Sequence, residues 1–229
     1  MHGTHPLIPG RTPDAPPSTP SPHDPLICSW GGAGDAISCR GSSRGQRPLK
    51  GASRHFPDFP ITACVSLGSN SGDSADIMRR ARQAVETLPK VKPVVASSLY
   101  RTEPQGFREQ PFFLNQVLLL ACAASLHPES LLASLLAVET ALGRTRETHR
   151  FGPRTIDLDL LLFGNKGMNT ESLTLPHPRM LDRAFVLVPL AEIAPDLPLP
   201  GGLTPVAALE RLEYRLCGDC IYQNANCGP

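Results

Sequence analysis

The chain has 229 residues, which is enough for one full domain with extensions or for two small domains. Its 22 basic and 21 acidic residues leave a net charge of +1, so bulk charge gives no reason to expect nucleic acid or a membrane as a partner. The sequence has no run of 18 or more apolar residues and no signal-like N-terminus, so we expect neither a transmembrane helix nor export. An odd, largely scattered set of seven cysteines then favours reduced thiols in a cytoplasmic protein.

Residues 1–58 form a separate zone of composition. Eight prolines between positions 6 and 25 break every potential helix, and glycine- and serine-rich runs follow. Such a segment cannot bury enough apolar surface to offset its ordering entropy, so we expect disorder, with a processed leader or a misassigned translation start as alternatives. We expect one ordered domain over residues 59–212 and a cysteine-containing tail over 213–229.

The first half of the predicted domain contains three strands and one helix. A short apolar run over 63–67 stops at a Gly-Ser-Asn turn, and a helical repeat follows it until Pro89. The turn lacks a Walker lysine, so we interpret it as a tight strand-to-helix connection rather than a phosphate loop. A second strand over 91–102 and a third over 113–123 flank a polar loop at 103–111, a length that is often functional.

The second half begins with a helix that Pro128 starts and Gly143 ends. A strand follows near 156–163, and residues 184–194 have a helix-like apolar composition that Pro189 interrupts. The order strand, helix, strand, strand, helix, strand is compatible with an α+β fold.

The strand near 156–163 carries the clearest functional pattern. Alternate side chains of a strand face opposite sides, and the apolar set here is Ile156, Leu158, Leu160 and Leu162. Asp157 and Asp159 would stand together on the other face, roughly 7 Å apart along the strand. Two hard oxygen ligands on a rigid strand suit Mg²⁺, which proteins hold with one or two carboxylates plus substrate phosphates. A surface strand with two solvated aspartates is the alternative.

Cationic residues gather on both sides of this strand. Residues 144–150 contain three arginines and a histidine, and Arg154 follows. Arginine suits bidentate contacts with phosphate, so these residues indicate a phosphorylated substrate, with a solvated loop as the alternative. Beyond the strand, His177 lies between two prolines and shares its segment with Arg179 and Arg183. A lone histidine is usually structural, but this one follows a metal-type strand.

Two further features leave alternatives open. Asn115 lies at the start of an otherwise apolar strand and, if buried, must hydrogen-bond either to the neighbouring loop or to the edge of a heteroaromatic ring. The C-terminal cysteines at 217, 220 and 227 supply three thiols, one short of a Cys₄ zinc site, so we do not predict zinc there.

With these motifs the chain resembles 6-hydroxymethyl-7,8-dihydropterin pyrophosphokinase (HPPK) of folate biosynthesis, over roughly residues 63–200. The motifs that carry the resemblance are Ser66–Asn70, Tyr100–Pro104, Phe113–Asn115, Arg150–Asp159, Leu175–Met180 and Arg183–Phe185. The arginine-to-Asp-x-Asp motif is highly specific on its own. The resemblance implies a ferredoxin-like α+β sandwich, with a mainly antiparallel sheet and helices packed on it, and a monomer.

The resemblance also implies a reaction and its residues. ATP gives its β,γ-pyrophosphoryl group to the hydroxymethyl oxygen of the pterin and leaves AMP, with two Mg²⁺ ions as cofactors. The implied catalytic set is Arg144, Arg154, Asp157 and Asp159, with Asp157 and Asp159 as the metal ligands. Further implied ATP-binding residues are Glu139, Arg146, Leu160, Thr174, His177 and Arg183. Implied pterin-binding residues are Thr102, Pro104, Gln105, Phe113, Asn115, Phe151 and Phe185.

Within the implied pterin site, Phe113 and Phe185 sandwich the ring. Loop residues 101–110 and the 144–150 segment are expected to flank the site and close over ATP. The sequence departs from the common residues of the family at three positions. Glu103 is expected to alter the mobility of its loop, and Glu147 and Ser172 are expected to affect minor phosphate contacts.

Two other functions use the same aspartate pair. A magnesium-dependent phosphohydrolase or nucleotidyltransferase would release phosphate or attach AMP. A nucleotide-binding scaffold that has lost catalysis would do neither, and the presence of Arg154, Asp157, Asp159 and Asn115 argues against it.

Overall fold

The computed structural model describes residues 56–104, 109–144 and 152–223, and these belong to one structural unit. Almost all of the predicted disordered segment 1–58, together with the predicted site residues Gln105, Arg146 and Phe151, lies outside the described residues. So do residues 105–108 of the 101–110 loop and residues 145–150 of the 144–150 segment, and the closure of both segments stays a prediction.

The centre of the described part is a sheet built around strand β1 (Ile61–Ser69). This strand pairs antiparallel with β4 (Phe113–Cys122) on one side and β5 (Asp157–Phe163) on the other. The strand order is β5-β1-β4-β3-β9-β8, and β2 also pairs with β4. Since seven of the nine residues of β1 are buried, the strand is covered on both faces. This explains why it is a continuous apolar run instead of an alternating one.

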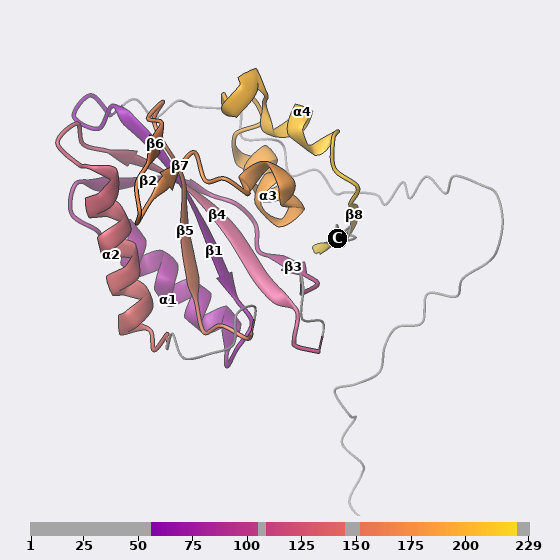
Figure 1. Cartoon of the computed structure of the whole chain (residues 1–229). Coiled ribbons are helices and arrows are strands. Elements are labelled where there is room, and N and C mark those ends of the chain that lie inside the picture. The colour runs from indigo at the N-terminus through magenta and orange to yellow at the C-terminus, as the bar shows by residue number, and fades with distance from the viewer. Residues whose placement is uncertain (1–55, 105–108, 145–151, 224–229) are drawn as a thin grey trace, which may run out of the picture. The chain divides into compact units, whose positions relative to one another are not determined.

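Helices cover the two faces of the sheet, as Figure 1 shows. On one face, α1 (Ser74–Glu86) and α2 (Pro128–Ala141) pack with Ala63, Val65 and Leu67. On the other face, α3 (Ala184–Ile193) and α4 (Pro205–Leu209) pack with Cys64, Val117 and Leu119. A mainly antiparallel sheet with helices packed on it confirms the predicted α+β class.

Helices α1 and α2 begin and end close to where the sequence predicts. Asp73 caps α1, and its carboxylate accepts a hydrogen bond from the backbone N of Asp76 at 3.1 Å. Pro128 is the first residue of α2, and Gly143, with a φ of 86°, follows its end. Pro189 does not interrupt α3, contrary to the prediction, because dense packing offsets a cost of roughly 3 kcal/mol for the interior proline. The buried residues of α3 are Ala184, Val186, Leu187, Val188, Pro189 and Leu190.

The predicted second strand is divided into two. β2 (Val91–Ala96) and β3 (Tyr100–Thr102) both pair with β4. Between them Ser97 replaces the regular ladder: its backbone N donates to Val117 O at 2.9 Å, and its hydroxyl accepts from Val117 N at 3.0 Å. The regular ladder with β4 is therefore interrupted at Ser97, while both backbone groups of Val117 keep a hydrogen-bond partner.

A β-bulge in β5 corrects one predicted orientation. The register between β1 and β5 shifts at Cys64 and Val65, so that Leu161 is the extra residue on β5. Leu158 and Leu160 pack on the α1–α2 face as predicted, but Leu162 packs on the opposite face with Cys64. An extra residue inverts the alternation of every side chain beyond it, which the sequence pattern alone did not reveal.

After β5 the chain forms a small second sheet and two short helical turns. A two-stranded ladder joins β6 (Met168–Asn169) to β7 (Thr174–Leu175). Short 3₁₀ turns follow at Met180–Asp182 and Pro200–Gly202. The backbone N of His177 donates to the O of Leu161, the bulged residue, at 2.9 Å. The bulge thus holds the His177 segment beside β5.

The region predicted as a tail contributes two strands to the sheet. β8 (Arg215–Cys217) pairs antiparallel with β9 (Cys220–Tyr222), and β9 pairs parallel with β3. No helix within the described ranges is long and apolar enough to cross a membrane.

Burial separates four of the cysteines into two classes, which predicts their reactivity. Burial raises the pKa of the Cys64 thiol strongly and that of Cys122 to about 12, whereas Cys217 is exposed. The thiolate is the reactive form, so iodoacetamide near neutral pH should alkylate Cys217 first, then the half-buried Cys220. Cys64 and Cys122 should react only after unfolding. Peptide mass spectrometry measures this order, and rapid native labelling of Cys64 would contradict the central position of β1.

Candidate active site

Two cavities meet beside the aspartate pair. The first has a volume of about 310 Å³ and the second about 520 Å³. Both are lined by Arg154, Asp157 and Asp159. A molecule in one cavity would therefore face a molecule in the other across these three side chains.

The register of the sheet leaves space next to the two carboxylates. Asp157 lies opposite Gly68 of β1, and Asp159 lies opposite Ser66. Both of these β1 residues line the first cavity. Because neither has a large side chain, the carboxylates are not covered from the neighbouring strand.

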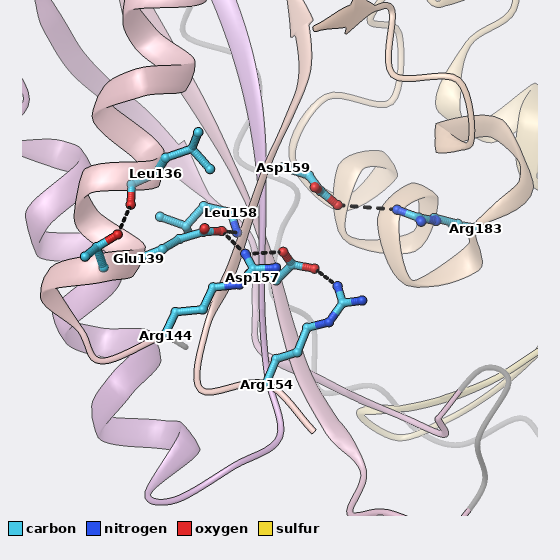
Figure 2. A network of polar contacts seen from close by, with 9 residues as sticks. Leu136, Glu139, Arg144, Arg154, Asp157, Leu158, Asp159 and Arg183 are labelled. Atoms are coloured by element: carbon cyan, nitrogen blue, oxygen red, sulfur yellow. Dashed lines mark hydrogen bonds and ion pairs between the residues drawn. The ribbon is translucent and has the colours of Figure 1, made fainter. Parts of the chain in front are cut away.

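Three arginines form ion pairs with the two aspartates (Figure 2). Asp157 is paired with both Arg144, at 2.6 Å, and Arg154. Asp159 is paired with Arg183 at 3.4 Å. These arginines come from the segment just after α2, the segment before β5 and the start of α3. These ion pairs join three parts of the chain at the site.

Glu139 contacts both Arg144 and the edge strand β5. Its side chain is buried, and it accepts a hydrogen bond from the backbone N of Leu158 at 2.7 Å. The same carboxylate oxygen pairs with Arg144. Burial raises the pKa of Glu139, while the Leu158 hydrogen bond and Arg144 lower it in part. Glu139 therefore positions Arg144 and β5, and it also lines the second cavity.

The pKa of Asp159 depends on its burial and on the charged groups around it. Burial raises the pKa of Asp159, and the charge of Asp157 raises it further, whereas His177 and Arg183 lower it. Burial lowers the pKa of His177, and Asp159 partly offsets that effect. His177 Nδ1 accepts a hydrogen bond from Arg179 N at 3.1 Å, so the neutral ring carries its proton on Nε2.

The aspartate pair fits a hard divalent cation. The two carboxylates supply oxygen ligands, and their mutual repulsion is the kind that a cation relieves. Among the described residues, no group of three or more His, Cys, Asp and Glu side chains is placed to hold a metal. A cation at Asp157 and Asp159 would therefore need phosphate and water as its other ligands, which is the usual binding mode of Mg²⁺ in phosphate-transfer sites.

The first cavity combines aromatic walls with one polar edge. Phe113 and Phe185 line it, as predicted. Asn115 is 4% exposed and donates from Nδ2 to Thr102 Oγ1 at 2.6 Å. A Cβ atom on Gly68 would lie 3.0 Å from Asn115 Oδ1, so only glycine leaves this amide undisturbed. The cavity suits a flat ring with hydrogen-bonding groups on one edge.

The structure brings most of the predicted site residues to one of the two cavities. The described residues of the predicted site that line the second cavity are Glu139, Arg144, Arg154, Asp157, Asp159, Leu160, Thr174 and His177. Arg183, predicted on the ATP side, lines the first cavity, where its guanidinium lies 5.4 Å from the Phe185 ring centre. Pro104 is buried but is not among the lining residues.

Asn70 supports the site from outside both cavities, and the sequence placed it in the motif Ser66–Asn70 without predicting a role for it. Its Oδ1 accepts from Arg154 N at 2.7 Å, and its backbone N donates to Arg154 O at 3.1 Å. Its Nδ2 donates to Gln110 and to Pro111 O. Asn70 thus fixes the backbone of Arg154, but Asn after Gly-Ser is so common in turns that the sequence gives no separate signal. Arg179 in the first cavity and Leu132 and Leu136 in the second were also not predicted.

Two bacterial proteins are similar to more than half of this chain. A protein of Methylorubrum extorquens named 2-amino-4-hydroxy-6-hydroxymethyldihydropteridine pyrophosphokinase is 45% identical over 151 residues, which is 66% of this chain and 93% of that protein. A Bacillus subtilis protein of the same name is 46% identical over 131 residues, 57% of this chain and 77% of its own length.

The fold is also similar to solved structures. Wild-type Plasmodium falciparum HPPK-DHPS, crystallised with pteroate, superposes with a TM-score of 0.52 and 13% identity over 70% of this chain. The chain spans only about half of that protein, since the match covers 47% of its length. At this identity the likeness supports the fold alone. The family model described as 7,8-dihydro-6-hydroxymethylpterin-pyrophosphokinase (HPPK) matches residues 64–195, more than half of the chain, and the chain belongs to this family.

Proposed function

We propose that the protein transfers the β,γ-pyrophosphoryl group of ATP to the hydroxymethyl oxygen of 6-hydroxymethyl-7,8-dihydropterin, releasing AMP, as a step of folate synthesis. In this transfer the substrate oxygen forms a bond to the β-phosphorus while the bond from that phosphorus to the α-phosphate bridge breaks. The proton of the hydroxyl is lost, and AMP takes the electron pair of the broken bond.

One observation carries this proposal: two cavities of different character share Arg154, Asp157 and Asp159. The first has aromatic walls and a buried amide, which suit the pterin. The second is lined by arginines, His177 and apolar residues of α2, which suits a nucleotide with its phosphates. Holding the two substrates against each other supplies much of the rate, because transfer between phosphates depends mainly on positioning and charge neutralisation.

On the pterin side, Phe113 and Phe185 stack on the ring and Asn115 reads its polar edge. The hydrogen bond from Asn115 Nδ2 to Thr102 fixes the amide, so its Oδ1 is presented as an acceptor in a set direction. A preorganised acceptor binds the amino and ring N–H groups of a pterin without reorganisation in the complex.

On the phosphate side, Asp157 and Asp159 are the residues that would hold two Mg²⁺ ions. Bound Mg²⁺ neutralises phosphate charge and orients the reacting oxygens. Arg144 and Arg154 then contact the phosphates, and Glu139 keeps Arg144 within reach. His177 would donate from Nε2 to a phosphate oxygen. We propose that the protein acts as a monomer. We also propose a cytoplasmic location.

The reaction products test the proposal against its alternatives. Protein incubated with ATP, Mg²⁺ and the pterin should form AMP only when the pterin is present, as measured by chromatography of the nucleotides. Phosphate release without pterin would indicate a phosphohydrolase, and AMP attached to the pterin a nucleotidyltransferase. Unchanged ATP would indicate a nucleotide-binding protein without catalysis. Each of these three outcomes contradicts the proposal.

Asp159→Ala should reduce kcat by a factor on the order of 10³, because one metal ligand and its charge are lost. Binding of the pterin, followed by its fluorescence, should stay measurable, since the aromatic walls and Asn115 are unchanged. Titration with Mn²⁺ by electron paramagnetic resonance should show weaker binding in the variant. Asp196→Ala, at an exposed position, is the matched control and should leave all three measurements unchanged. An active Asp159→Ala enzyme would refute the metal-ligand role.

Gly68→Ala should weaken pterin binding selectively. The new methyl group would lie 3.0 Å from Asn115 Oδ1, so the amide must move and its hydrogen bond to Thr102 must lengthen. Loss of about one hydrogen bond raises the pterin KM roughly fivefold to tenfold, whereas the ATP KM stays within about twofold. Gly167→Ala is the control, because nothing lies within 4 Å of its added Cβ. Equal effects of the two variants would contradict the proposed role of Asn115.

A further inference from the structure

The strand pair β8–β9 lies beyond the part of the chain that the family model matches. That match ends at residue 195, whereas β8 begins at Arg215 and β9 ends at Tyr222. Figure 1 shows this segment returning to the β3 side of the sheet. Its contacts are with three elements that carry walls of the first cavity.

The first contact is with β3. Arg101 and Thr102 of β3 are register partners of Cys220 and Ile221 of β9, and Arg101 N donates to Asp219 O at 2.8 Å. Thr102 is the residue that accepts the hydrogen bond of Asn115. Strand β9 thus pairs with the strand that carries Thr102, and this pairing restrains the polar edge of the cavity.

The second contact is aromatic. The rings of Tyr222 and Phe112 meet edge to face, with centroids 6.2 Å apart. The guanidinium of Arg101 lies 5.7 Å from the Phe112 ring centre. Phe112 precedes Phe113, which lines the cavity. Edge-to-face ring pairs are more favourable than burial of the same area alone, so Tyr222 restrains the start of β4.

The third contact is at the start of α3. Gln223 Oε1 accepts from Ala184 N at 2.8 Å, and Gln223 Nε2 donates to Asp182 O at 2.6 Å. The first N–H groups of a helix have no intrahelical partner, and the residue at the N-cap of α3 forms no side-chain cap. Gln223 therefore supplies from a distant part of the chain the cap that α3 lacks locally.

The residues on either side of Ala184 are Arg183 and Phe185, and both line the first cavity. Ala184 itself is fully buried and packs with Val188 and with Ile221 of β9. A shift of the first turn of α3 would move the guanidinium that pairs with Asp159 and the ring that faces the pterin. The position of the first turn of α3 therefore determines where Arg183 and Phe185 lie in the first cavity.

We propose that Gln223 is a positioning residue and that residues 215–223 fix the shape of the pterin cavity. Gln223 does so by capping α3, and β9 does so by pairing with β3. The inference rests on the proposed function for its kinetic consequence. Its structural part, the cap on Ala184, can be tested without any turnover.

Hydrogen exchange tests the cap directly. In Gln223→Ala the Ala184 amide loses its acceptor and should exchange at least about fivefold faster, measured by NMR or by mass spectrometry of the 180–190 peptide. In Gln223→Glu a carboxylate oxygen still accepts from Ala184 N, while the donor to Asp182 O is lost. Slow exchange should therefore be kept. Gln83→Ala, on the exposed surface of α1, is the matched control. Unchanged exchange in Gln223→Ala would overturn the cap.

Kinetics test the consequence. Gln223→Ala should raise the pterin KM about fivefold, with kcat and the ATP KM within about twofold, and Gln223→Glu should restore most of the pterin affinity. A general loss of stability would instead lower kcat and affect both substrates, and so would overturn the positioning role. If the wild-type protein forms no pterin-dependent AMP, the proposed function fails. Faster exchange at Ala184 together with unchanged pterin binding would overturn the positioning role while leaving the function intact.

Discussion

The interaction on which the rest of the site depends is the pairing of two carboxylates on one edge strand with three arginines. Asp157 and Asp159 bring two negative charges to one face of β5, where partial burial makes their repulsion costly. Each charge is neutralised by an arginine from a different element. The segment just after α2, the segment before β5 and the start of α3 are therefore joined electrostatically. Displacement of any one of them changes the charge balance of the whole site.

The proposed reaction uses the same arginines for a second purpose. Arginines that neutralise carboxylates are also placed to neutralise phosphates, so ligand binding redistributes partners among charges that are already in the site. Two residues restrain the arginines during this exchange of partners. Glu139 holds the side chain of Arg144, and Asn70 holds the backbone of Arg154. Glu139 lines the second cavity, whereas Asn70 lines neither cavity. Their effect is to limit how far the two arginines can move.

The sequence predicted the α+β fold because period-two alternation and helix caps are local signals, and the Asp-x-Asp strand indicated a magnesium and phosphate site. The other site residues were implied by the family resemblance, and most of those that the structure describes line one of the two cavities. It did not predict the bulge at Leu161, since an extra residue in an apolar run leaves the composition unchanged. It also did not predict that α3 continues through Pro189, because packing outweighs local preference there. The role of Asn70 and the return of Gln223 to α3 depend on contacts between residues about 40 or more positions apart, which periodicity cannot report.

The pairing of β9 with β3 has a consequence for association between molecules. β3 has only three residues, and without β9 its outer N–H and C=O groups would form an open sheet edge next to the cavity. Open edges recruit strands of other chains, and proteins blunt them with short or charged edge strands. Here the exposed edge is transferred to β8, which is three residues long, begins with Arg215 and ends at a Gly-Asp turn. The open edge on this side of the sheet thereby lies at β8 instead of β3, the strand that carries Thr102 of the first cavity.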